Sequence, residues 1–343
     1  AVLPAVLVFK KKQSTFDETR FVSIYSFKTL GKEKPAKSVF DAILRGSGSY
    51  AINNDSYFEV KSGQLQKSAD PGEVWRVSNK ETDSWISQVA QFTEITFRQI
   101  GKVRVGVKTT ADKVFLLKDW SSLPSHLIPE NEVLKPLITH HSAGRFKQAN
   151  GNTRKILYPH IIVNGKKQAV DLTKYPNASR YLNSHRVQLE GREYLIEAGR
   201  QWFEIWVPHE PDLWRRPKIV FRDICDRPTF WMDTSGAIVN GDCYWLTQFE
   251  NIHDDYLWIS LAVANSTFIE SFYDHKFNNK LYAGRRRFMT QYVEQFPIPK
   301  LTDAQRTKVV DLTKELFNAL PNPCGDKEAE LDKLIWSFFG FSS

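Results

Sequence analysis

The sequence contains little sulfur and no long apolar run. Its 343 residues include three cysteines, Cys225, Cys243 and Cys324, which are widely spaced and form no C-x-x-C pair. This pattern argues against a disulfide framework or a zinc finger and favours a reducing, cytoplasmic setting. No apolar stretch is long enough to span a bilayer, so no membrane association is expected. The apolar opening AVLPAVLVF lacks a preceding basic region, so a signal peptide is not expected either.

Several catalytic signatures are also missing. The sequence has no G-x-G-x-x-G, no Gly-rich loop ending in G-K-[ST] and no H-E-x-x-H. The Asn-Pro of LPNPCG, residues 320–325, lies between two expected helices and is interpreted as a turn. The chain begins at Ala1, and its methionines are Met232 and Met289. We therefore expect a piece of a longer protein, with a function shared with sequence outside this chain.

Positive charge is concentrated in one segment. The formal net charge is +8, and residues 98–167 contain thirteen Lys or Arg against four acidic residues. A localised basic surface is typical of a protein that binds a polyanion. A solvated basic face without a partner would explain the charge equally well before any motif is considered.

The expected secondary structure is mixed. Apolar and β-branched runs predict strands at 1–9, 20–27, 57–60, 157–163 and 218–247, the last group forming a meander or small barrel. Helical spacing predicts helices near 36–45, 82–100 and 178–199, and a helical region from about Asp254 onward. Polar stretches at 46–55 and 124–152 are expected to be loops. The predicted fold is α+β with a helical C-terminal end.

The stretch RVGVKTTADKVFLL, residues 104–117, carries the most distinctive chemistry. Its Gly106 allows close approach of another backbone, and Lys108 and Lys113 supply positive charge beside the hydroxyls of Thr109 and Thr110. Lysine side chains, hydroxyls and backbone amides are the usual donors to phosphate oxygens. A β-hairpin whose hydroxyls satisfy its own turn is the structural alternative.

Other polar clusters are weaker candidates. Further basic candidates for DNA contact are Arg145, Lys147, Arg222, Arg285, Arg286 and Arg287, although a solvated turn or a buried ion pair explains each of them as well. The pair His140-His141 is expected on a loop, exposed or facing phosphate, rather than on a metal. Glu59 and Lys61, with Asp41 or Asp55, have the outline of a metal-dependent nuclease site, a pattern that is common by chance.

The order of these pieces resembles a known family, the TaqI-like adenine-N6 DNA methyltransferases, including type IIG restriction-modification enzymes. VGVKTTADKVFLL is similar to the stretch that opens their target-recognition region. Further similar stretches follow in the family's order: LKPLI, GRF, YPNASRYLNSHRVQLEGR, RPKIVFRDI, NGDCYWLT, LAVANSTFIESFY and a terminal LDKLIWSFFGF. The opening LPAVLVFKKK with FVSIYSF resembles the last strands of the family's catalytic domain. One departure is Thr110, where the family has glycine.

The resemblance implies a division of labour. The family's S-adenosylmethionine motif and its Asn-Pro-Pro-Tyr belong to a preceding catalytic domain and are absent here, so the chain alone is expected to hold no cofactor and to be inactive. Residues 1–30 would then end a truncated methyltransferase domain, 31–250 would form the target-recognition region and 251–343 a helical region. The expected partners are double-stranded DNA and the missing catalytic domain.

The resemblance also suggests roles for individual residues. Lys108, Thr109, Thr110 and Lys113 would position the DNA backbone, Arg145 and Arg222 would contact base edges, and Arg285 to Arg287 would contact phosphates. Two alternatives remain open at this point: a module that docks other restriction-modification subunits through LDKLIWSFFGF, and the nuclease.

Overall fold

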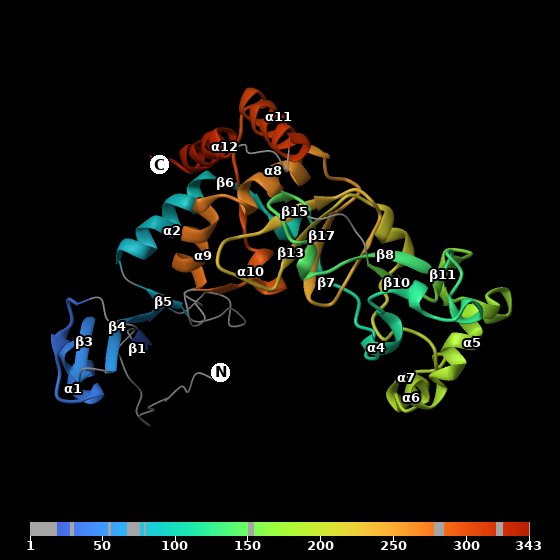
Figure 1. Ribbon diagram of the computed structural model, residues 1–343. Helices are drawn as coiled ribbons and strands as arrows, with labels where there is room; N and C mark the ends of the chain where they lie inside the picture. The colour runs from blue at the N-terminus through green and yellow to red at the C-terminus, as the bar shows by residue number, and fades with distance from the viewer. Residues whose placement is uncertain are drawn as a thin grey trace, which may run out of the picture. The chain divides into compact units, whose positions relative to one another are not determined.

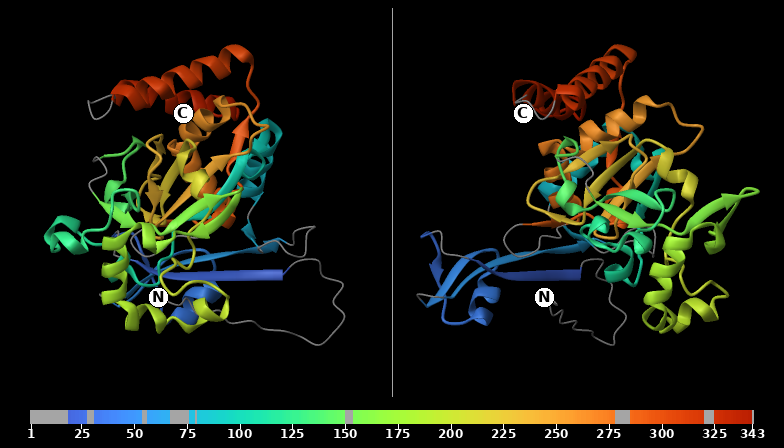
Figure 2. Two further views of the ribbon diagram at one scale, coloured as in Figure 1. Left: turned by 90° about the vertical axis from the view of Figure 1, so that its right-hand side faces the viewer. Right: turned by 45° about the vertical axis from the view of Figure 1, so that its right-hand side comes forward.

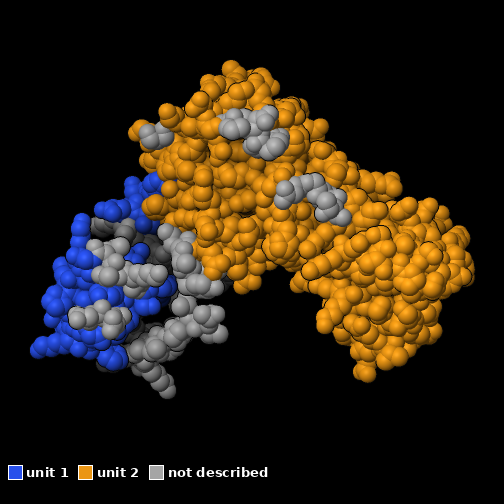
Figure 3. All heavy atoms as spheres, in the orientation of Figure 1, with its two compact units in different colours: residues 1–86 blue, residues 87–343 orange. Residues whose placement is uncertain are grey.

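The computed structural model describes residues 19–27, 31–53, 56–66, 76–78, 80–149, 154–277, 285–319 and 325–342. The chain divides into two compact units, residues 1–86 and residues 87–343 (Figure 3). Both units mix helices with strands, which confirms the predicted α+β class. No helix among the described residues is long and apolar enough to cross a membrane.

The first unit is built on an antiparallel sheet. Its main strand order is β1-β4-β3-β2, with β5 also paired to β4; the strands are β1 (Thr19–Phe27), β2 (Lys34–Pro35), β3 (Gly48–Asn53), β4 (Ser56–Gln66) and β5 (Arg76–Ser78). The helix α1 (Val39–Arg45) contributes Ala42 to a small core with Tyr50 and Val60. The predicted strand at 20–27 and helix at 36–45 are confirmed, and the predicted strand at 1–9 lies outside the described residues.

One expectation for this unit was wrong. Residues 46–55 were expected to be a loop, but β3 occupies most of that range and pairs with β4. Gly46 ends α1 with a φ of +86°, and the polar residues that follow satisfy their backbone groups in the ladder. Because β1 also pairs with β4, this sheet spans the predicted boundary at residue 30. The boundaries at 30 and 250 stay predictions.

The second unit is organised around a five-stranded sheet. Its order is β7-β17-β13-β15-β9, with strands β7 (Gly101–Val105), β17 (Cys243–Gln248), β13 (Lys218–Arg222), β15 (Phe230–Asp233) and β9 (Phe146–Lys147). The central strands β13 and β15 are almost wholly buried. The order is not the predicted meander, because β17 joins the free side of β13 and the intervening β16 (Ile238–Val239) pairs elsewhere.

Helices from the C-terminal part cover this sheet (Figure 1). The helix α8 (Asp255–Ala264) contacts β13 and β15, and α11 (Asp303–Ala319) and α12 (Gly325–Phe338) lie together against α8 (Figure 2). The helices α9 (Thr267–Phe277) and α10 (Thr290–Val293) complete the region, which confirms the predicted helical C-terminal end. Two short strands interrupt it, β18 (Arg286–Arg287) and β19 (Pro297–Pro299).

The helix predicted over 82–100 is shorter than expected. The helix α2 (Lys80–Phe92) ends where β6 (Thr93–Thr96) begins, and β6 pairs with β19 before the short α3 (Phe97–Ile100). The Thr93 hydroxyl donates to the carbonyl of Val89 at 2.7 Å, and the backbone N–H of Lys300 donates to the carbonyl of Phe92 at 2.8 Å. These bonds satisfy the carbonyls at the helix end, so a β-branched segment can leave as a strand.

A second lobe of the same unit is formed by elements between residue 106 and about residue 215, apart from β9, which belongs to the five-stranded sheet (Figure 1). It contains β8 (Leu134–Ile138), which pairs with β16 and β10 (Lys155–Leu157), and a hairpin of β11 (His160–Val163) and β12 (Lys166–Ala169). Its helices are α4 (Asp112–Phe115), α5 (Pro176–Ser184), α6 (Arg186–Glu190) and α7 (Glu193–Glu197). One apolar cluster joins this lobe to the five-stranded sheet, from Leu182 and Leu189 to Trp231 and Trp245.

The helix predicted over 178–199 is therefore three short helices. The break after α6 coincides with Gly191 and with Arg192, whose side chain is buried. The Arg192 guanidinium donates to the carbonyls of Leu189, Thr109, Glu204 and Trp202 at 3.2, 3.0, 3.0 and 2.6 Å. An inward-facing arginine surrounded by main-chain carbonyls replaces the outward charged face that the sequence pattern predicts for this position.

Candidate nucleic-acid interface

The stretch 106–113 is not the hairpin that was the structural alternative. It leaves β7, whose partner is β17, and enters α4. Its backbone is held by two distant segments. The N–H of Gly106 donates to the carbonyl of Cys243 at 2.8 Å and that of Val107 to the carbonyl of Val239 at 2.8 Å, both at the turn between β16 and β17, and the N–H of Lys108 donates to the carbonyl of Val207 at 3.2 Å. The N–H of Val207 returns a bond to Lys108 at 3.0 Å. We call residues 106–113 the basic loop.

The glycines of this region are required by close backbone approach. A Cβ atom on Gly106 would lie 2.0 Å from the carbonyl oxygen of Asn240, and one on Gly241 would lie 2.7 Å from that of Val107. Both distances are shorter than any van der Waals contact, and the obstructing atoms are backbone. The expectation that Gly106 permits the approach of another backbone is met by this chain's own turn at Asn240.

The two threonines have different surroundings. Thr109 is buried, and its hydroxyl donates to the carboxylate of Asp112 and accepts from the N–H of Ala111 at 3.1 Å. Thr110 is exposed and has a φ of +58°, the left-handed region that favours glycine. Thr110, which stands where the similar family stretch has glycine, thus has a backbone conformation that glycine adopts readily. The Thr110 hydroxyl donates to the Thr109 carbonyl at 2.6 Å.

The lysines of the basic loop face solvent. Lys108 and Lys113 are both exposed, and neither forms an ion pair with a residue in the described part of the chain. The loop backbone is anchored at both sides, and Asp112, the one acidic residue of the loop, accepts from the Thr109 hydroxyl and pairs with neither lysine. Such a rigid mount for exposed ammonium groups is suited to an anionic surface.

Arg222 lies at the same end of the five-stranded sheet. It pairs with Cys243, the residue whose carbonyl binds Gly106, so β13, β17 and β7 present Arg222 and the basic loop at neighbouring strand ends. With neighbouring strands about 4.8 Å apart, the backbones of Arg222 and Gly106 are separated by roughly 10 Å. Arg222 is half-buried, and its side chain forms no hydrogen bond or ion pair with the described residues.

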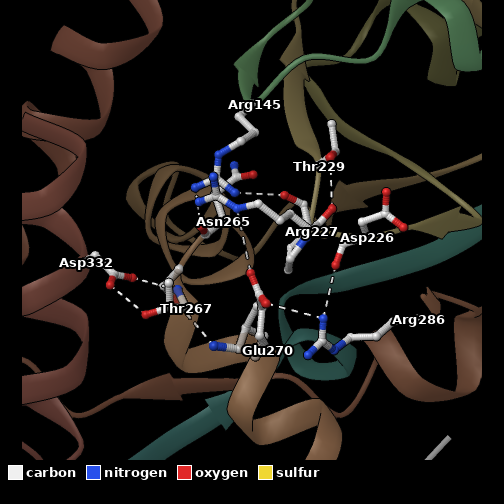
Figure 4. A network of polar contacts seen from close by, with 12 residues as sticks. Arg145, Asp226, Arg227, Thr229, Asn265, Thr267, Glu270, Arg286 and Asp332 are labelled. Carbon is white, nitrogen blue, oxygen red and sulfur yellow. Dashed lines mark hydrogen bonds and ion pairs between the residues drawn. The ribbon is translucent and has the colours of Figure 1, made fainter. Parts of the chain in front are cut away.

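Arg145 is bound inside the protein (Figure 4). Its guanidinium donates to the carbonyl of Pro228 at 2.9 Å, to that of Asn265 at 2.6 Å and to the carboxylate of Glu328 at 2.9 Å. Its side chain is only 19% exposed. The structure therefore gives Arg145 a role in fastening α12 to the sheet, and a base contact by this residue would require these bonds to break.

The remaining basic candidates are also engaged to different degrees. Arg286 is buried and binds Asp274 through two bonds of 2.8 Å, and Arg287 is exposed and binds Asp223 at 3.1 Å. Lys147 is half-buried, with its ammonium 5.7 Å from the centre of the Phe317 ring. Arg285, the first residue of the described range 285–319, is half-buried. Neither Arg286 nor Arg287 forms a side-chain hydrogen bond or ion pair with the basic loop, as far as the structure is described.

The residues that resemble a metal-dependent nuclease site lie in the first unit. Asp41 is on α1, where it binds Arg45 at 2.8 Å, and the N–H of Lys37 donates to its carboxylate and lowers the pKa of that group. Glu59 and Lys61 lie on β4, with the Lys61 Nζ atom 3.6 Å from Glu59 Oε1. Asp55 lies outside the described residues. Among the described residues no three His, Cys, Asp or Glu side chains are placed to hold a metal ion. The carboxylates are thus used in local ion pairs.

Sequence reasoning missed the residues that hold the basic loop. Arg192, Val207 and Asn240 contact it from positions about 80 to 140 residues away along the chain. No local pattern marks them, because Arg192 stands in a charged helical stretch and the other two contribute backbone atoms. The one available signal was the glycine pair, Gly106 and Gly241, each of which indicates a close backbone approach.

Comparison with known proteins gives consistent matches. Residues 43–298 match the TaqI-like C-terminal specificity domain. The type II methyltransferase M.BanIII of Aneurinibacillus aneurinilyticus is 38% identical over 296 residues, which cover 85% of this chain and 50% of that protein. M.MjaIV of Methanocaldococcus jannaschii is 24% identical over 274 residues, covering 75% of this chain and 85% of that protein. This chain therefore spans about half the length of M.BanIII.

A solved structure supports the fold. The type IIL restriction-modification enzyme MmeI, determined in complex with DNA, superposes with a TM-score of 0.53 over 87% of this chain and 42% of that chain. The sequences are 13% identical, so the likeness concerns the fold alone.

Proposed function

Because the chain belongs to the family of TaqI-like C-terminal specificity domains, we propose that it recognises DNA for a site-specific adenine-N6 methyltransferase of a restriction-modification system. The observation that carries the proposal is the basic loop, whose two exposed lysines form no ion pair within the described ranges and whose backbone is held by two distant segments.

The proposed roles follow from the side chains. Lys108 and Lys113 contact phosphates as point charges, and the anchored backbone fixes where they do so. Thr109 acts indirectly, since its buried hydroxyl holds Asp112 and the N–H of Ala111. Arg222 at the neighbouring strand end is the proposed reader of a base edge, because a guanidinium can bind guanine O6 and N7 together. Arg145 and Arg286 are assigned no DNA contact.

Methyl transfer is proposed to take place on a catalytic domain and not on this chain. The target adenine would be turned out of the stack into that domain, where S-adenosylmethionine supplies the methyl group for N6. The crevice that the structure describes beside Arg145 does not fit that cofactor. The described crevice of about 280 Å³ beside Arg145 is lined by Asn265, Glu328 and Asp332, and all of these polar side chains already bind the protein itself. The task left to this chain is to hold and orient the duplex.

The salt dependence of DNA binding tests the proposal. Each phosphate contact adds about 0.9 to the slope of log affinity against log salt concentration for duplex DNA. Replacing Lys108 and Lys113 with Ala should therefore flatten the slope by about 1.8 and weaken binding to every duplex. Fluorescence anisotropy with a labelled 30-base-pair duplex, over a series of NaCl concentrations, measures both quantities.

A matched variant controls for net charge. Lys308→Ala with Lys333→Ala removes two exposed lysines from the C-terminal helices α11 and α12. Its slope should stay within error of the unsubstituted protein. An unchanged slope in the Lys108 and Lys113 variant would remove the basic loop from the interface, and absence of any salt-sensitive binding would contradict the proposal as a whole.

The rival role as a subunit-docking module has less support. Its candidate segment, residues 331–341, buries Leu331, Ile335, Phe338 and Phe339 within the second unit. The Phe339 ring stacks on that of Phe268 with the ring centres 4.0 Å apart. The apolar face that would dock a subunit is occupied internally. The buried thiols of Cys225 and Cys243 are consistent with the cytoplasmic location that we propose.

A further inference from the structure

A second polar cluster lies beside the basic loop. The short strand β16 runs parallel to β8, pairing Val239 with Ile138, and its Val239 carbonyl also binds the N–H of Val107. The next residue, Asn240, donates its N–H to the Ile138 carbonyl at 2.8 Å. The end of β16 is therefore held between the end of β8 and the basic loop. The residues that follow each of these segments emerge together at one place on the surface.

His140 and His141 are the residues that follow β8. Thr139, which is buried, begins their turn and accepts from the N–H of His141 at 3.3 Å. Because Ile138 and Val107 flank Val239 on either side, their backbones are two strand spacings apart, roughly 10 Å. His140 and Lys108 lie two residues and one residue beyond these positions. A DNA strand, with a phosphate about every 3.4 Å of helix axis, can pass both points at once.

Asp242, two residues beyond Asn240, fixes the orientation of His140. Its Oδ2 atom lies 2.5 Å from His140 Nδ1 and accepts from the His140 backbone N–H at 3.3 Å. The His141 ring lies against that of His140, with the ring centres 3.9 Å apart. Because Nδ1 is held by the carboxylate, Nε2 is the nitrogen that remains for an external partner. The His140 side chain is 43% exposed, so the ring can be reached from solvent.

The chemistry of the cluster favours a phosphate over a metal ion. In a protonated imidazole ring whose Nδ1–H donates to a carboxylate, the Nε2–H is the proton donor that remains for a phosphate oxygen. Metal binding would need the lone pair on the outer nitrogen and further ligands, and no three suitable side chains converge on a metal position among the described residues. An exposed His–Asp pair contributes little to stability, so fold stability alone gives little reason for this fixed geometry.

We propose that His140, oriented by Asp242 and stacked on His141, is a second phosphate-binding point next to the basic loop. The inference rests on the proposed function, since it concerns the same duplex. His140 donates from Nε2 to a phosphate oxygen, and Asp242 is a positioning residue that touches no DNA. The contact is made to the DNA backbone and is therefore independent of base sequence.

The test compares variants of the full chain on a random-sequence 30-base-pair duplex at pH 6.5, by anisotropy over a series of NaCl concentrations. His140→Ala should flatten the log–log salt slope by about 0.9 and weaken binding equally for unrelated duplexes. Asp242→Asn should flatten it by a smaller amount, because the imidazole loses its partner but not its place. His140→Lys should restore the slope, since a lysine supplies the same donor charge.

The chain offers a matched control. His253 lies 3.4 Å from Asp255, just beyond the opposite end of β17, and is also an exposed His–Asp pair. His253→Ala should leave the slope unchanged, and a loss equal to that of His140→Ala would overturn the inference.

Three further outcomes separate the two proposals. If the unsubstituted protein binds with a slope that depends on Lys108 and Lys113, but His140→Ala and Asp242→Asn leave it intact, the histidine contact is wrong and the proposed function stands. If the protein shows no salt-dependent DNA binding, the proposed function itself is wrong. Loss of affinity for some duplexes and not others would replace the phosphate contact by a base contact and overturn the inference as stated.

Discussion

Arg145 provides the sharpest division between a structural role and a DNA-binding role. Replacing it with Ala removes the donor from the carbonyls of Pro228 and Asn265 and leaves the Glu328 carboxylate without its main partner. Hydrogen bonds to a charged group contribute about 1.5–3 kcal/mol each when buried. The Arg145 and Glu328 side chains are 19% and 35% exposed, and water can partly replace the lost bonds. We therefore expect a loss of about 3 kcal/mol in the free energy of unfolding.

For a unit of this size, 1 kcal/mol corresponds to roughly 2–4 °C in the midpoint of thermal unfolding, so the expected fall is roughly 6–12 °C. Tryptophan fluorescence during thermal and urea unfolding measures the change. Glu328→Gln should lower the midpoint less than Arg145→Ala, because an amide oxygen still accepts from the guanidinium. Arg287→Ala removes an arginine from the exposed pair with Asp223 and should cost under about 1 kcal/mol.

DNA binding then separates the two roles. Below its unfolding transition, Arg145→Ala should keep the salt slope and the sequence preference of the unsubstituted protein. A variant with an unchanged unfolding midpoint that has lost discrimination between DNA sequences would refute the structural assignment and restore Arg145 as a reader of base edges.

Three further predictions concern groups held inside the second unit. Burial lowers the pKa of His160 from 6.5 to about 3, so the folded protein favours the neutral ring. The free energy of unfolding, measured with urea, should therefore be highest above about pH 6.5 and fall by about 2 kcal/mol by pH 5. His160→Gln should remove this part of the pH dependence. Gly106→Ala should displace the basic loop, because the added Cβ meets a main-chain carbonyl oxygen. It should destabilise the protein by at least about 2 kcal/mol and weaken DNA binding. Gly325→Ala, with open space around the added atom, is the control and should change neither stability nor DNA binding. The thiols of Cys225 and Cys243 are buried, with the pKa of Cys225 raised to about 11 by burial, so both should resist a disulfide exchange reagent until the protein is unfolded; rapid labelling of either thiol in the native protein would contradict the packing.

The elements that could be predicted from the sequence are those whose pattern is local. The strand at 20–27, the helix at 36–45 and the C-terminal helices each follow from residues that are close together in the sequence, and the structure confirms them. The strands between 218 and 247 were also recognised, since apolar residues dominate them. Their order was not, because strand order depends on which backbones pair across the sheet and adjacent sequence does not specify it.

The candidate site was predictable only in part. The basic loop was recognised from its composition, and the structure leaves Lys108 and Lys113 exposed as that interpretation requires. The direction of each side chain could not be read from the sequence. Thr109 and Thr110 are neighbours of one type, yet one is buried and the other exposed, because the left-handed φ of Thr110 turns the chain between them. The inward direction of Arg145 depends on Glu328, which lies 183 residues away along the chain.

Part of the positive charge of residues 98–167 is thus bound inside the protein, while Lys108 and Lys113 and also Arg98 and Arg154 are exposed. Arg104 lies over the Trp245 ring at 5.1 Å and donates to the Thr247 hydroxyl at 3.0 Å, and Arg145 fastens α12. A planar guanidinium can satisfy several fixed carbonyls at once, whereas an ammonium group is a mobile point charge that stays hydrated. In this fold Arg104 and Arg145 form their bonds inside the protein, and lysines such as Lys108 and Lys113 place positive charge at the surface. Such a surface holds a duplex through phosphates and gives strong salt dependence with little sequence discrimination, so discrimination between sequences must come from a few residues at the sheet end, for which Arg222 is the proposed candidate.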